Sequence, residues 1–473
     1  FLDQLDTLGW EISDLGAGVP TDPTTSFRTD FQEVTLKQIF FEQVRKINTT
    51  DSGQAWLADD PLEELHGQLL DLSDHSLVEA NAEVMRLLFR AQVDRNEITG
   101  EEDPVVKLID FGDFSKNRFM AINQFRVETP GGVKDHIRPD IVLFVNGLPL
   151  VVVECKVASS YEANPMSSAL KQLRRYADQR LSSKRAGLKE GEEKLFWFNQ
   201  LMIATYGDDC KYGTISSGDD HYYQWKSIYP DKYTDYKKPL GEERAQERLI
   251  QGMLPPENLL KILRSFTVFM EPDEGARIKV VCRYQQFRAV GKIMERLRTG
   301  ETDDERSGVI WHTQGSGKSL TMVFLIRVMT HSHDLNDTKI LLVNDRTDLE
   351  EQLGETALMT GVKVNYIESS KQVKSDLATS ASDLNMVMIH KFKEADSQNP
   401  DYLQTALSAG EMAAAETSVS YGEVKEFSLF GVVNKSEKIL IMIDEAHRTQ
   451  SSDLGDNLFM AFPNAARIAF TGT

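Results

Sequence analysis

The chain has 473 residues, enough for two or three domains of about 150 residues each. With 41% hydrophobic and 27% charged residues and no excess of glycine or proline, its composition excludes a fibrous or disordered chain. No apolar run approaches the ~18 residues that span a bilayer, so the sequence predicts no membrane segment.

Cys155, Cys210 and Cys282 lie far apart and form no CxxC or Cys/His pattern. The sequence therefore predicts neither a disulfide framework nor a structural zinc site, and a reducing cytoplasm is the expected location. No signal-peptide pattern is present, and because the chain begins at Phe1 rather than Met we expect a few preceding residues to be missing.

A net charge of −20 argues against a nucleic-acid binder, for which a basic domain is the usual footprint. Local grooves rather than the average charge set phosphate contacts, however. One local basic run is present, and it is predicted to be a solvated helix face unless it lines such a groove. Its members are Lys171, Arg174, Arg175, Arg180, Lys184, Arg185 and Lys189.

Apolar residues recur at helical spacing from about Asp30 to Ile47 and from about Leu77 to Val93. The pattern then changes to runs rich in Val, Ile and Phe at residues 119–127 and 140–157, which predict strands. Within the second run, Asn146-Gly147 predicts a tight hairpin, because both residue types tolerate positive φ.

A helix is expected from Asn164-Pro165 to about Leu181, followed by a strand from Leu195 to Tyr206. Residues 207–245 are polar and rich in aromatic and turn residues, which predicts an irregular excursion. Residues 1–255 are therefore expected to form an α/β domain with helices around a mixed sheet.

From about Gln286 onward, apolar strands alternate with helices, which predicts a parallel sheet covered on both faces. Residues 256–473 are expected to form this second domain. Its predicted strands are 309–311, 340–343, 386–389, 439–443 and 468–470, with a helix over 318–330.

The segment from His312 to Ser319 lies between a predicted strand and a predicted helix, as a phosphate-binding loop requires. Glycines let backbone N–H groups wrap phosphates, and the helix N-terminus adds partial positive charge. Lys318 is expected to reach the β- and γ-phosphates of ATP, and Ser319 to hold Mg²⁺. His312 departs from the strict pattern, which has glycine there. The other predicted ATP-binding residues of the loop are Thr313, Gly315, Ser316 and Gly317.

Asp444-Glu445-Ala446-His447 follows the apolar strand ending at Ile443. Asp444 is expected to coordinate Mg²⁺ and Glu445 to orient the attacking water, because ligands sit at the carboxyl ends of parallel strands. Alone, this motif is explained as well by a solvated charge run. Its place after a phosphate loop and an apolar strand favours the nucleotide site.

Three further segments resemble superfamily 2 helicase motifs in their usual order. Arg283-Tyr284-Gln285 looks like a Q-motif, which implies that Gln285 reads adenine. Residues 343–349 look like motif Ia, and Thr471-Gly472-Thr473 looks like motif III. The resemblance implies a RecA-like lobe, with a second lobe expected beyond Thr473.

Asp140 after Pro139, and Glu154 two residues before Lys156, match the PD-(D/E)xK nuclease pattern. Strand alternation places Glu154 and Lys156 on one face, and the hairpin returns Asp140 to Glu154. Two carboxylates would then hold Mg²⁺, and Lys156 would orient or polarise the attacking water. A surface ion pair is the alternative explanation of so short a motif.

Gln172 and Tyr176 on the next predicted helix share a face at i and i+4, so both can point at this site. This QxxxY pair resembles the RecB-like nuclease branch. Residues 145–150, 310–319 and 444–450 resemble the restriction (motor and nuclease) subunit of type I restriction-modification enzymes, here its N-terminal part. Nucleases of this type often use an early helical acid, and no motif selects among Glu33, Glu42, Glu79 and Glu83.

The resemblance implies an ATP-dependent translocase and Mg²⁺-dependent endonuclease that cleaves unmodified double-stranded DNA. It implies methyltransferase and specificity subunits as partners, and a cytoplasmic location. Two alternatives stay open: another nuclease–helicase fusion such as a repair protein, or a motor whose N-terminal domain is a non-catalytic DNA-binding or docking module. His75 and His136 have no second ligand at a metal-site spacing, and the cluster His221–Trp225 is expected to pack a loop rather than stack on bases.

Overall fold

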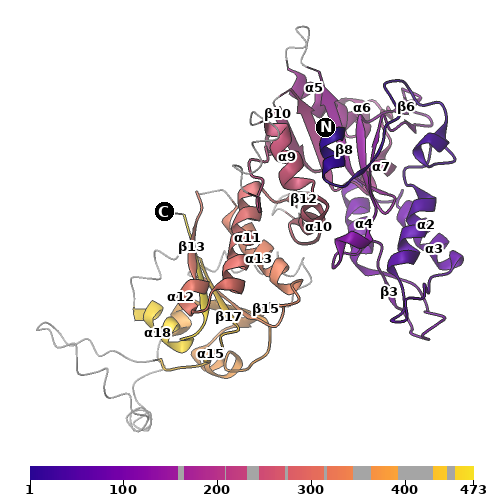
Figure 1. The fold of residues 1–473 in the computed structure, drawn as a ribbon. Coiled ribbons are helices and arrows are strands. Elements are labelled where there is room, and N and C mark those ends of the chain that lie inside the picture. The colour runs from indigo at the N-terminus through magenta and orange to yellow at the C-terminus, as the bar shows by residue number, and fades with distance from the viewer. Residues whose placement is uncertain are drawn as a thin grey trace, which may run out of the picture. The chain divides into compact units, whose positions relative to one another are not determined.

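The computed structural model describes residues 1–157, 164–207, 209–231, 244–271, 275–313, 317–344, 364–392, 430–444 and 453–472. The chain divides into two compact units, Phe1–Arg288 and Ala289–Thr473 (Figure 1). This division lies later than the predicted boundary at residue 255, because the segment that follows stays bonded to the first unit. The Thr214 hydroxyl donates to the Lys279 carbonyl at 2.7 Å, and the Tyr212 hydroxyl donates to the Cys282 carbonyl at 2.8 Å.

The first unit contains a six-stranded sheet in the order β1-β4-β7-β8-β9-β10. The pairs β1–β4 and β8–β9 are parallel and the other neighbours antiparallel, so the predicted mixed sheet is confirmed. The strands are β1 (Glu11–Ser13), β4 (Phe119–Asn123), β7 (Ile141–Val145), β8 (Leu148–Lys156), β9 (Leu201–Tyr206) and β10 (Asp209–Gly213). Small two-stranded sheets pair β2 (Ala91–Gln92) with β3 (Val105–Val106), β5 (Val127–Glu128) with β6 (His136–Ile137), and β11 (Thr267–Met270) with β12 (Ile278–Val281).

Two helices and one strand of the first unit differ in extent from the predicted ones. The first amphipathic helix begins at Lys37 rather than near Asp30, and the Arg126 guanidinium lies over the Phe31 ring before it. The helix after Pro165 ends at Tyr176, because Asp178 has a φ of 52°. The predicted strand at residues 195–206 begins with a helical turn. The helices are α1 (Leu2–Thr7), α2 (Lys37–Ile47), α3 (Asp59–Leu70), α4 (Leu77–Arg90), α5 (Pro165–Tyr176), α6 (Leu181–Arg185), α7 (Glu193–Trp197), α9 (Ala245–Met253), α10 (Pro256–Ser265) and α11 (Tyr284–Thr299), which runs into the second unit.

The predicted hairpin between β7 and β8 is present, with φ of 51° at Asn146 and 82° at Gly147. A Cβ atom at residue 147 would lie 2.6 Å from the Leu36 carbonyl oxygen, so α2 can approach the turn only because glycine is there. The Gly147 carbonyl in turn accepts a hydrogen bond from the Leu36 amide at 2.9 Å. The turn is thus held against the start of α2.

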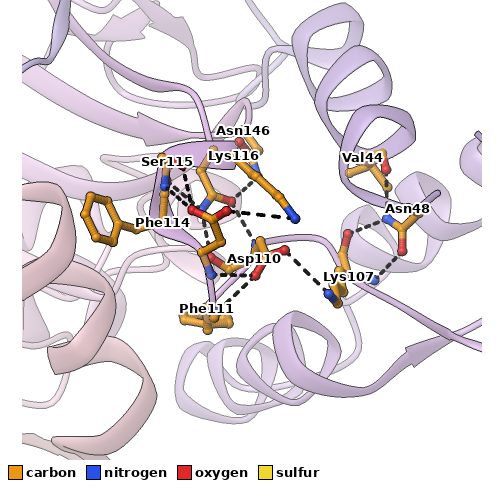
Figure 2. A network of polar contacts seen from close by, with 12 residues as sticks. Val44, Asn48, Lys107, Asp110, Phe111, Phe114, Ser115, Lys116 and Asn146 are labelled. Carbon is orange, nitrogen blue, oxygen red and sulfur yellow. Dashed lines mark hydrogen bonds and ion pairs between the residues drawn. The ribbon is translucent and has the colours of Figure 1, made fainter. Parts of the chain in front are cut away.

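A buried polar network supports the same turn from the other side (Figure 2). The Asn146 amide group donates to Asn117 Oδ1 at 2.9 Å, and Asn117 Oδ1 also accepts from the Asp110 backbone at 2.8 Å. The Asp110 carboxylate accepts from two backbone amides and pairs with Lys107, whose own amide donates to Asn48 Oδ1 at the end of α2. Although burial raises the pKa of Asp110, these bonds outweigh it and hold the pKa below its usual value. The network therefore fixes β7 and β8 relative to α2.

The second unit contains a six-stranded sheet in the order β13-β18-β17-β14-β16-β15, with every neighbouring pair parallel. All five predicted strands are present, and β15 is an additional one. The elements are α12 (Asp303–Arg306), β13 (Gly308–Trp311), α13 (Lys318–Thr330), β14 (Lys339–Asn344), β15 (Val364–Ile367), α15 (Ser370–Asp376), β16 (Leu384–Met388), β17 (Ile439–Asp444), α18 (Asp453–Ala461) and β18 (Ala466–Thr471).

Alternation along the buried strands explains how this sheet takes helices on both faces. Leu341, Val343 and Ile441 join one apolar cluster with α15 and α18 residues such as Val373 and Leu458. No residue of α13 belongs to that cluster, although most of its apolar residues are buried, so α13 covers the opposite face. In the described part of the chain, no helix is long and apolar enough to cross a membrane.

Candidate functional site

Asp140, Glu154 and Lys156 meet at one edge of the first sheet. The register of β7 on β8 pairs Ile141 with Val153, so Asp140 just before β7 lies beside Glu154 near the end of β8. The Cys155 amide donates to Asp140 Oδ2 at 2.7 Å, which joins the two strand ends directly. The hairpin and the strand alternation thus bring the three predicted residues together.

A row of hydrogen bonds connects this strand end to α5. Lys156 Nζ lies 2.7 Å from Glu154 Oε1 and donates to Gln172 Oε1 at 3.1 Å. Gln172 Nε2 donates to the Tyr176 hydroxyl at 2.5 Å, and that hydroxyl donates to the Arg138 carbonyl at 2.8 Å. All four predicted side chains of this row are therefore in one connected group, with Asp140 beside it.

Local sequence explains where α5 places its two polar residues. The Asn164 side chain accepts from the Ser167 amide at 3.0 Å, which caps the helix, and Pro165 occupies its first turn. Ala169 and Leu173 are buried, and α5 packs on β8 and β9. Gln172 and Tyr176, one turn apart, then reach the end of β8.

Burial governs the protonation of the site. Glu154 is 1% exposed, and burial together with the charge of Asp140 raises its pKa to about 7, although Lys156 opposes the shift. The Oε2 atom of Glu154 is buried and has no partner at hydrogen-bonding geometry, because the Tyr176 hydroxyl, which lowers the pKa of Glu154 from nearby, donates to the Arg138 carbonyl instead. Burial and the nearby Glu154 charge also raise the pKa of the Tyr176 hydroxyl above its usual range. The Cys155 thiol, whose pKa burial raises to about 12, is a neutral group at neutral pH.

These residues fit a divalent cation held by two carboxylates. A buried carboxylate oxygen without a partner, beside a second carboxylate, is costly unless a cation neutralises it, and hard cations such as Mg²⁺ take oxygen ligands. Across the described ranges, no group of three or more His, Cys, Asp or Glu side chains gathers at a metal-site spacing. The early acids do not extend the pair, because Glu33 bonds to Thr29, Glu79 to Arg277 and Glu83 to Arg86, and Glu42 is exposed.

One side chain that contacts Asp140 belongs to no sequence motif. Gln124 Nε2 lies 3.4 Å from Asp140 Oδ1, and the Gln124 amide donates to the Asp140 carbonyl at 2.8 Å. The sequence gives no signal for Gln124, because it is a single glutamine after a strand and has no polar partner at a helical spacing such as the one that links Gln172 and Tyr176.

The second unit brings the two halves of the predicted nucleotide site together. Gly317, with a φ of 87°, precedes α13, and Lys318 is the first residue of that helix. Lys318 Nζ lies 2.8 Å from Asp444 Oδ1 at the end of β17, and the side chains are 16% and 8% exposed. A glycine turn, a helix N-terminus, a lysine and an aspartate thus meet at the carboxyl ends of parallel strands, as a phosphate and cation site requires.

His312, which stands where the strict loop pattern has glycine, has a structural role at the end of β13. Its backbone amide donates to the Thr471 carbonyl at 2.8 Å, which continues the pairing of β13 with β18. Its buried ring lies with Nε2 3.3 Å from the Thr321 hydroxyl in α13, and burial lowers its pKa. The ring therefore packs against the first turns of α13 and joins the end of β13 to that helix.

The remaining predicted nucleotide residues are distributed as follows. Thr313 is exposed just after β13, and Ser319 is the second residue of α13. Gln285 lies at the start of α11, in the first compact unit. Gly315, Ser316, Glu445, the motif Ia residues 345–349 and Thr473 lie outside the described residues.

Two other sequence features have structural roles. Four members of the basic run pair with acids: Arg174 with Asp219, Arg180 with Glu190, Lys184 with Glu193 and Lys189 with Glu192. The run does not form one helix face as predicted, because it spans α5, α6 and the residues after α6. In the aromatic cluster, Trp225 is 1% exposed and packs on Tyr212 and Phe287, so it belongs to the core rather than to a base-stacking surface.

Comparison with known families gives two matches that cover different parts of the chain. Residues 1–221 match the family described as type I restriction enzyme R protein N terminus, and residues 285–473 match the SWI2/SNF2 ATPase family. The second unit, with its all-parallel sheet, thus has the fold of an SWI2/SNF2 ATPase-type lobe.

Curated relatives match along the whole chain. It is 29% identical to the type I restriction enzyme HindI endonuclease subunit of Haemophilus influenzae, over 100% of this chain and 42% of the relative. It is 24% identical to the putative type I restriction enzyme MjaIXP endonuclease subunit of Methanocaldococcus jannaschii, over 100% of this chain and 41% of the relative. The chain therefore spans about two fifths of the length of these relatives. A solved SWI2/SNF2 ATPase core of Sulfolobus solfataricus in complex with dsDNA is 17% identical and covers 43% of this chain and 34% of that one, at a TM-score of 0.26 that is too low to support further comparison.

Proposed function

We propose the function of this chain from its family, since it belongs to the endonuclease subunits of type I restriction enzymes and matches their N-terminal region. The first compact unit is a PD-(D/E)xK-type nuclease domain, and the second is the first RecA-like lobe of an ATP-driven DNA translocase. The complete subunit cleaves unmodified double-stranded DNA together with methyltransferase and specificity subunits in the cytoplasm.

One observation supports the nuclease assignment above all others: Asp140, just before β7, meets Glu154 and Lys156 of β8 and Gln172 and Tyr176 of α5 at one sheet edge. Asp140 and Glu154 would hold Mg²⁺, which neutralises charge on the phosphate and activates water. Lys156 orients or polarises the attacking water. Gln172 accepts a hydrogen bond from the Lys156 ammonium and so positions it. The Tyr176 hydroxyl, which donates to the Arg138 carbonyl, accepts from Gln172 and positions that side chain in turn.

In the motor lobe, Lys318 neutralises the β- and γ-phosphates of ATP. Ser319 and Asp444 are the groups that would hold the accompanying Mg²⁺, and Glu445 orients the attacking water. Gly315, Ser316 and Gly317 wrap the phosphates with backbone amides, and Thr313 borders them. The 2.8 Å contact of Lys318 with Asp444 supports this proposal, because it brings together a cation suited to phosphate and an acid suited to a metal ion.

The test uses the complete subunit assembled with its methyltransferase and specificity subunits. Cutting of unmethylated, covalently closed circular DNA is measured with ATP and Mg²⁺, next to ATP hydrolysis. Asp140→Ala is expected to abolish cutting while ATP hydrolysis continues, and Asp135→Ala, at an exposed acid in the same connection between β4 and β7, is the matched control.

The outcomes separate the alternatives. Normal cutting by Asp140→Ala would show that the first unit is a DNA-binding or docking module. Cutting that ignores both methylation and the partner subunits would instead indicate a repair-type nuclease–helicase fusion.

A further inference from the structure

The backbone of Gln124 is strained where it bonds to the segment that carries Asp140. Gln124 follows β4 directly and has a φ of 49°, in the left-handed region that side chains other than glycine, asparagine and aspartate rarely adopt. Two backbone bonds impose this conformation: the Gln124 amide donates to the Asp140 carbonyl at 2.8 Å, and the Phe125 amide donates to the Pro139 carbonyl at 3.1 Å. The strained residue is therefore bonded to the segment that carries Asp140.

The Gln124 side chain adds a second costly feature. Its Nε2 atom lies 3.4 Å from Asp140 Oδ1, and only the NH₂ end of an amide can donate to a carboxylate. The amide oxygen Oε1 must then point the other way, where it is buried and has no hydrogen-bond partner. An unpaired buried acceptor is destabilising, so this orientation of the amide adds to the cost of the strained backbone.

Both oxygens of the Asp140 carboxylate are consequently held by donors. Oδ1 faces the Gln124 amide, and Oδ2 accepts from the Cys155 backbone at 2.7 Å. The Asp140 charge contributes to the raised pKa of Glu154, so the two carboxylates repel each other across this edge. A carboxylate pair that shares one cation needs such restraints to keep both groups directed at it.

We propose that Gln124 is a positioning residue of the nuclease site, which orients Asp140 for the divalent cation. Strain and an unpaired acceptor persist at functional positions because the surrounding structure supports them. The inference rests on the nuclease function proposed above, since it assigns Gln124 a role only if Asp140 is a metal ligand.

The experiment uses variants of the complete subunit that separate the backbone from the amide. Gln124→Gly keeps the left-handed backbone without strain and removes the amide. Gln124→Asn keeps an amide on a residue that tolerates positive φ. Asp103→Gly is the matched control, since Asp103 has a φ of 51° in the connection between β2 and β3, away from this edge.

Three quantities are measured: Mn²⁺ binding by electron paramagnetic resonance in the absence of nucleotide, the Mg²⁺ dependence of DNA cutting by the assembled enzyme, and the melting temperature. The Mn²⁺ that binds wild type but not Asp140→Ala defines the site. Gln124→Gly is expected to weaken this binding and to raise the half-saturating Mg²⁺ concentration, each by about tenfold, while the melting temperature stays equal or rises. Gln124→Asn should recover part of the affinity, and Asp103→Gly should match wild type in metal binding and cutting.

Wild-type Mn²⁺ affinity and Mg²⁺ dependence in Gln124→Gly would overturn the positioning role. A lower melting temperature with unchanged metal affinity would equally overturn it, since that is the result of a purely structural residue. Normal cutting by Asp140→Ala would contradict the nuclease function itself, which is a different outcome from either of these.

Discussion

The ammonium nitrogen of Lys318 lies 2.8 Å from Oδ1 of Asp444, although the two residues come from the start of α13 and the end of β17. Both side chains are mostly buried, so each compensates a charge that would otherwise be poorly solvated. Binding of Mg·ATP would replace this ion pair, because Lys318 would then contact the phosphates and Asp444 the magnesium ion.

We therefore expect Lys318→Ala to abolish Mg·ATP hydrolysis by the complete subunit. Lys318 carries the positive charge at the start of α13, and removing it also leaves Asp444 without the cation beside it. Hydrolysis is measured with saturating DNA, and Lys292→Ala, at an exposed lysine of α11, is the control. Unchanged hydrolysis in Lys318→Ala would contradict the nucleotide site.

DNA cutting and ATP-driven translocation should be separable, because Lys156 and Lys318 belong to different compact units. Lys156→Ala is expected to reduce DNA cutting about 100- to 1,000-fold, or ~3–4 kcal/mol of transition-state stabilisation, through loss of one preorganised charge. ATP hydrolysis and translocation should persist. Both activities are measured at one salt concentration, because DNA affinity depends on salt.

The matched control is Lys171→Ala, at an exposed lysine of α5 next to Gln172. It should cut like wild type. If Lys156→Ala cuts at the normal rate the nuclease assignment is wrong, and if it also stops ATP hydrolysis the separation of the two activities is wrong.

The raised pKa of Glu154, about 7, predicts a pH-dependent metal requirement. Below this pH a cation must displace one proton from Glu154, so the half-saturating Mg²⁺ concentration for cutting should rise about tenfold per pH unit. Above pH 8 it should level off. The measurement is a Mg²⁺ titration of cutting from pH 6 to pH 9, with ATP hydrolysis followed in parallel to remove effects on the motor. A half-saturating concentration that does not change with pH would contradict the role of Glu154 as a ligand.

The raised pKa of Glu154 also makes the free energy of unfolding depend on pH. The folded state binds more protons than the unfolded state between 4.5, the ordinary pKa of a glutamate side chain, and about 7, so the contribution of Glu154 to the free energy of unfolding falls as pH rises through this window. Glu154→Gln removes the buried charge. It is therefore expected to be more stable than wild type by roughly 3 kcal/mol at pH 8 without metal, and equally stable near pH 4. Thermal unfolding at both pH values tests this, and a destabilised Glu154→Gln at pH 8 would show that the Lys156 pairing outweighs burial.

Lys279 is predicted to lock the segment before the motor to the first unit. This side chain in β12, 2% exposed as a residue, donates to Asn81 Oδ1 at 2.7 Å, Gln200 Oε1 at 2.6 Å and the Asn199 carbonyl at 3.2 Å. Lys279→Met leaves three buried acceptors without this donor, at an expected cost of about 3 kcal/mol. Hydrogen exchange should accelerate at residues 196–200 and 278–281.

Lys261→Met is the control for this change, because Lys261 is exposed and pairs with Glu257 one turn away on α10. Its cost should stay within about 0.5 kcal/mol. Equal exchange rates in the Lys279 and Lys261 variants would contradict a structural role for the buried Lys279 side chain.

Local sequence determined the elements that carry both sites. Positive φ at Asn146 and Gly147 makes the hairpin, and a spacing of two along β8 places Glu154 and Lys156 on one face. A spacing of four along α5 brings Gln172 beside Tyr176. These relationships depend on backbone periods of 2 and 3.6, which nearby residues reveal by themselves.

Only the tertiary structure decided the contacts between distant segments. The approach of Gln124 to Asp140, the three oxygens around Lys279 and the division at Arg288 all depend on how strands are ordered and which loops they bring together. No periodic signal encodes such contacts, because each is formed by side chains whose separation along the chain is unrelated to their distance in space. The carboxylate pair could thus be named from the sequence, whereas the residue that orients it became visible only in the fold.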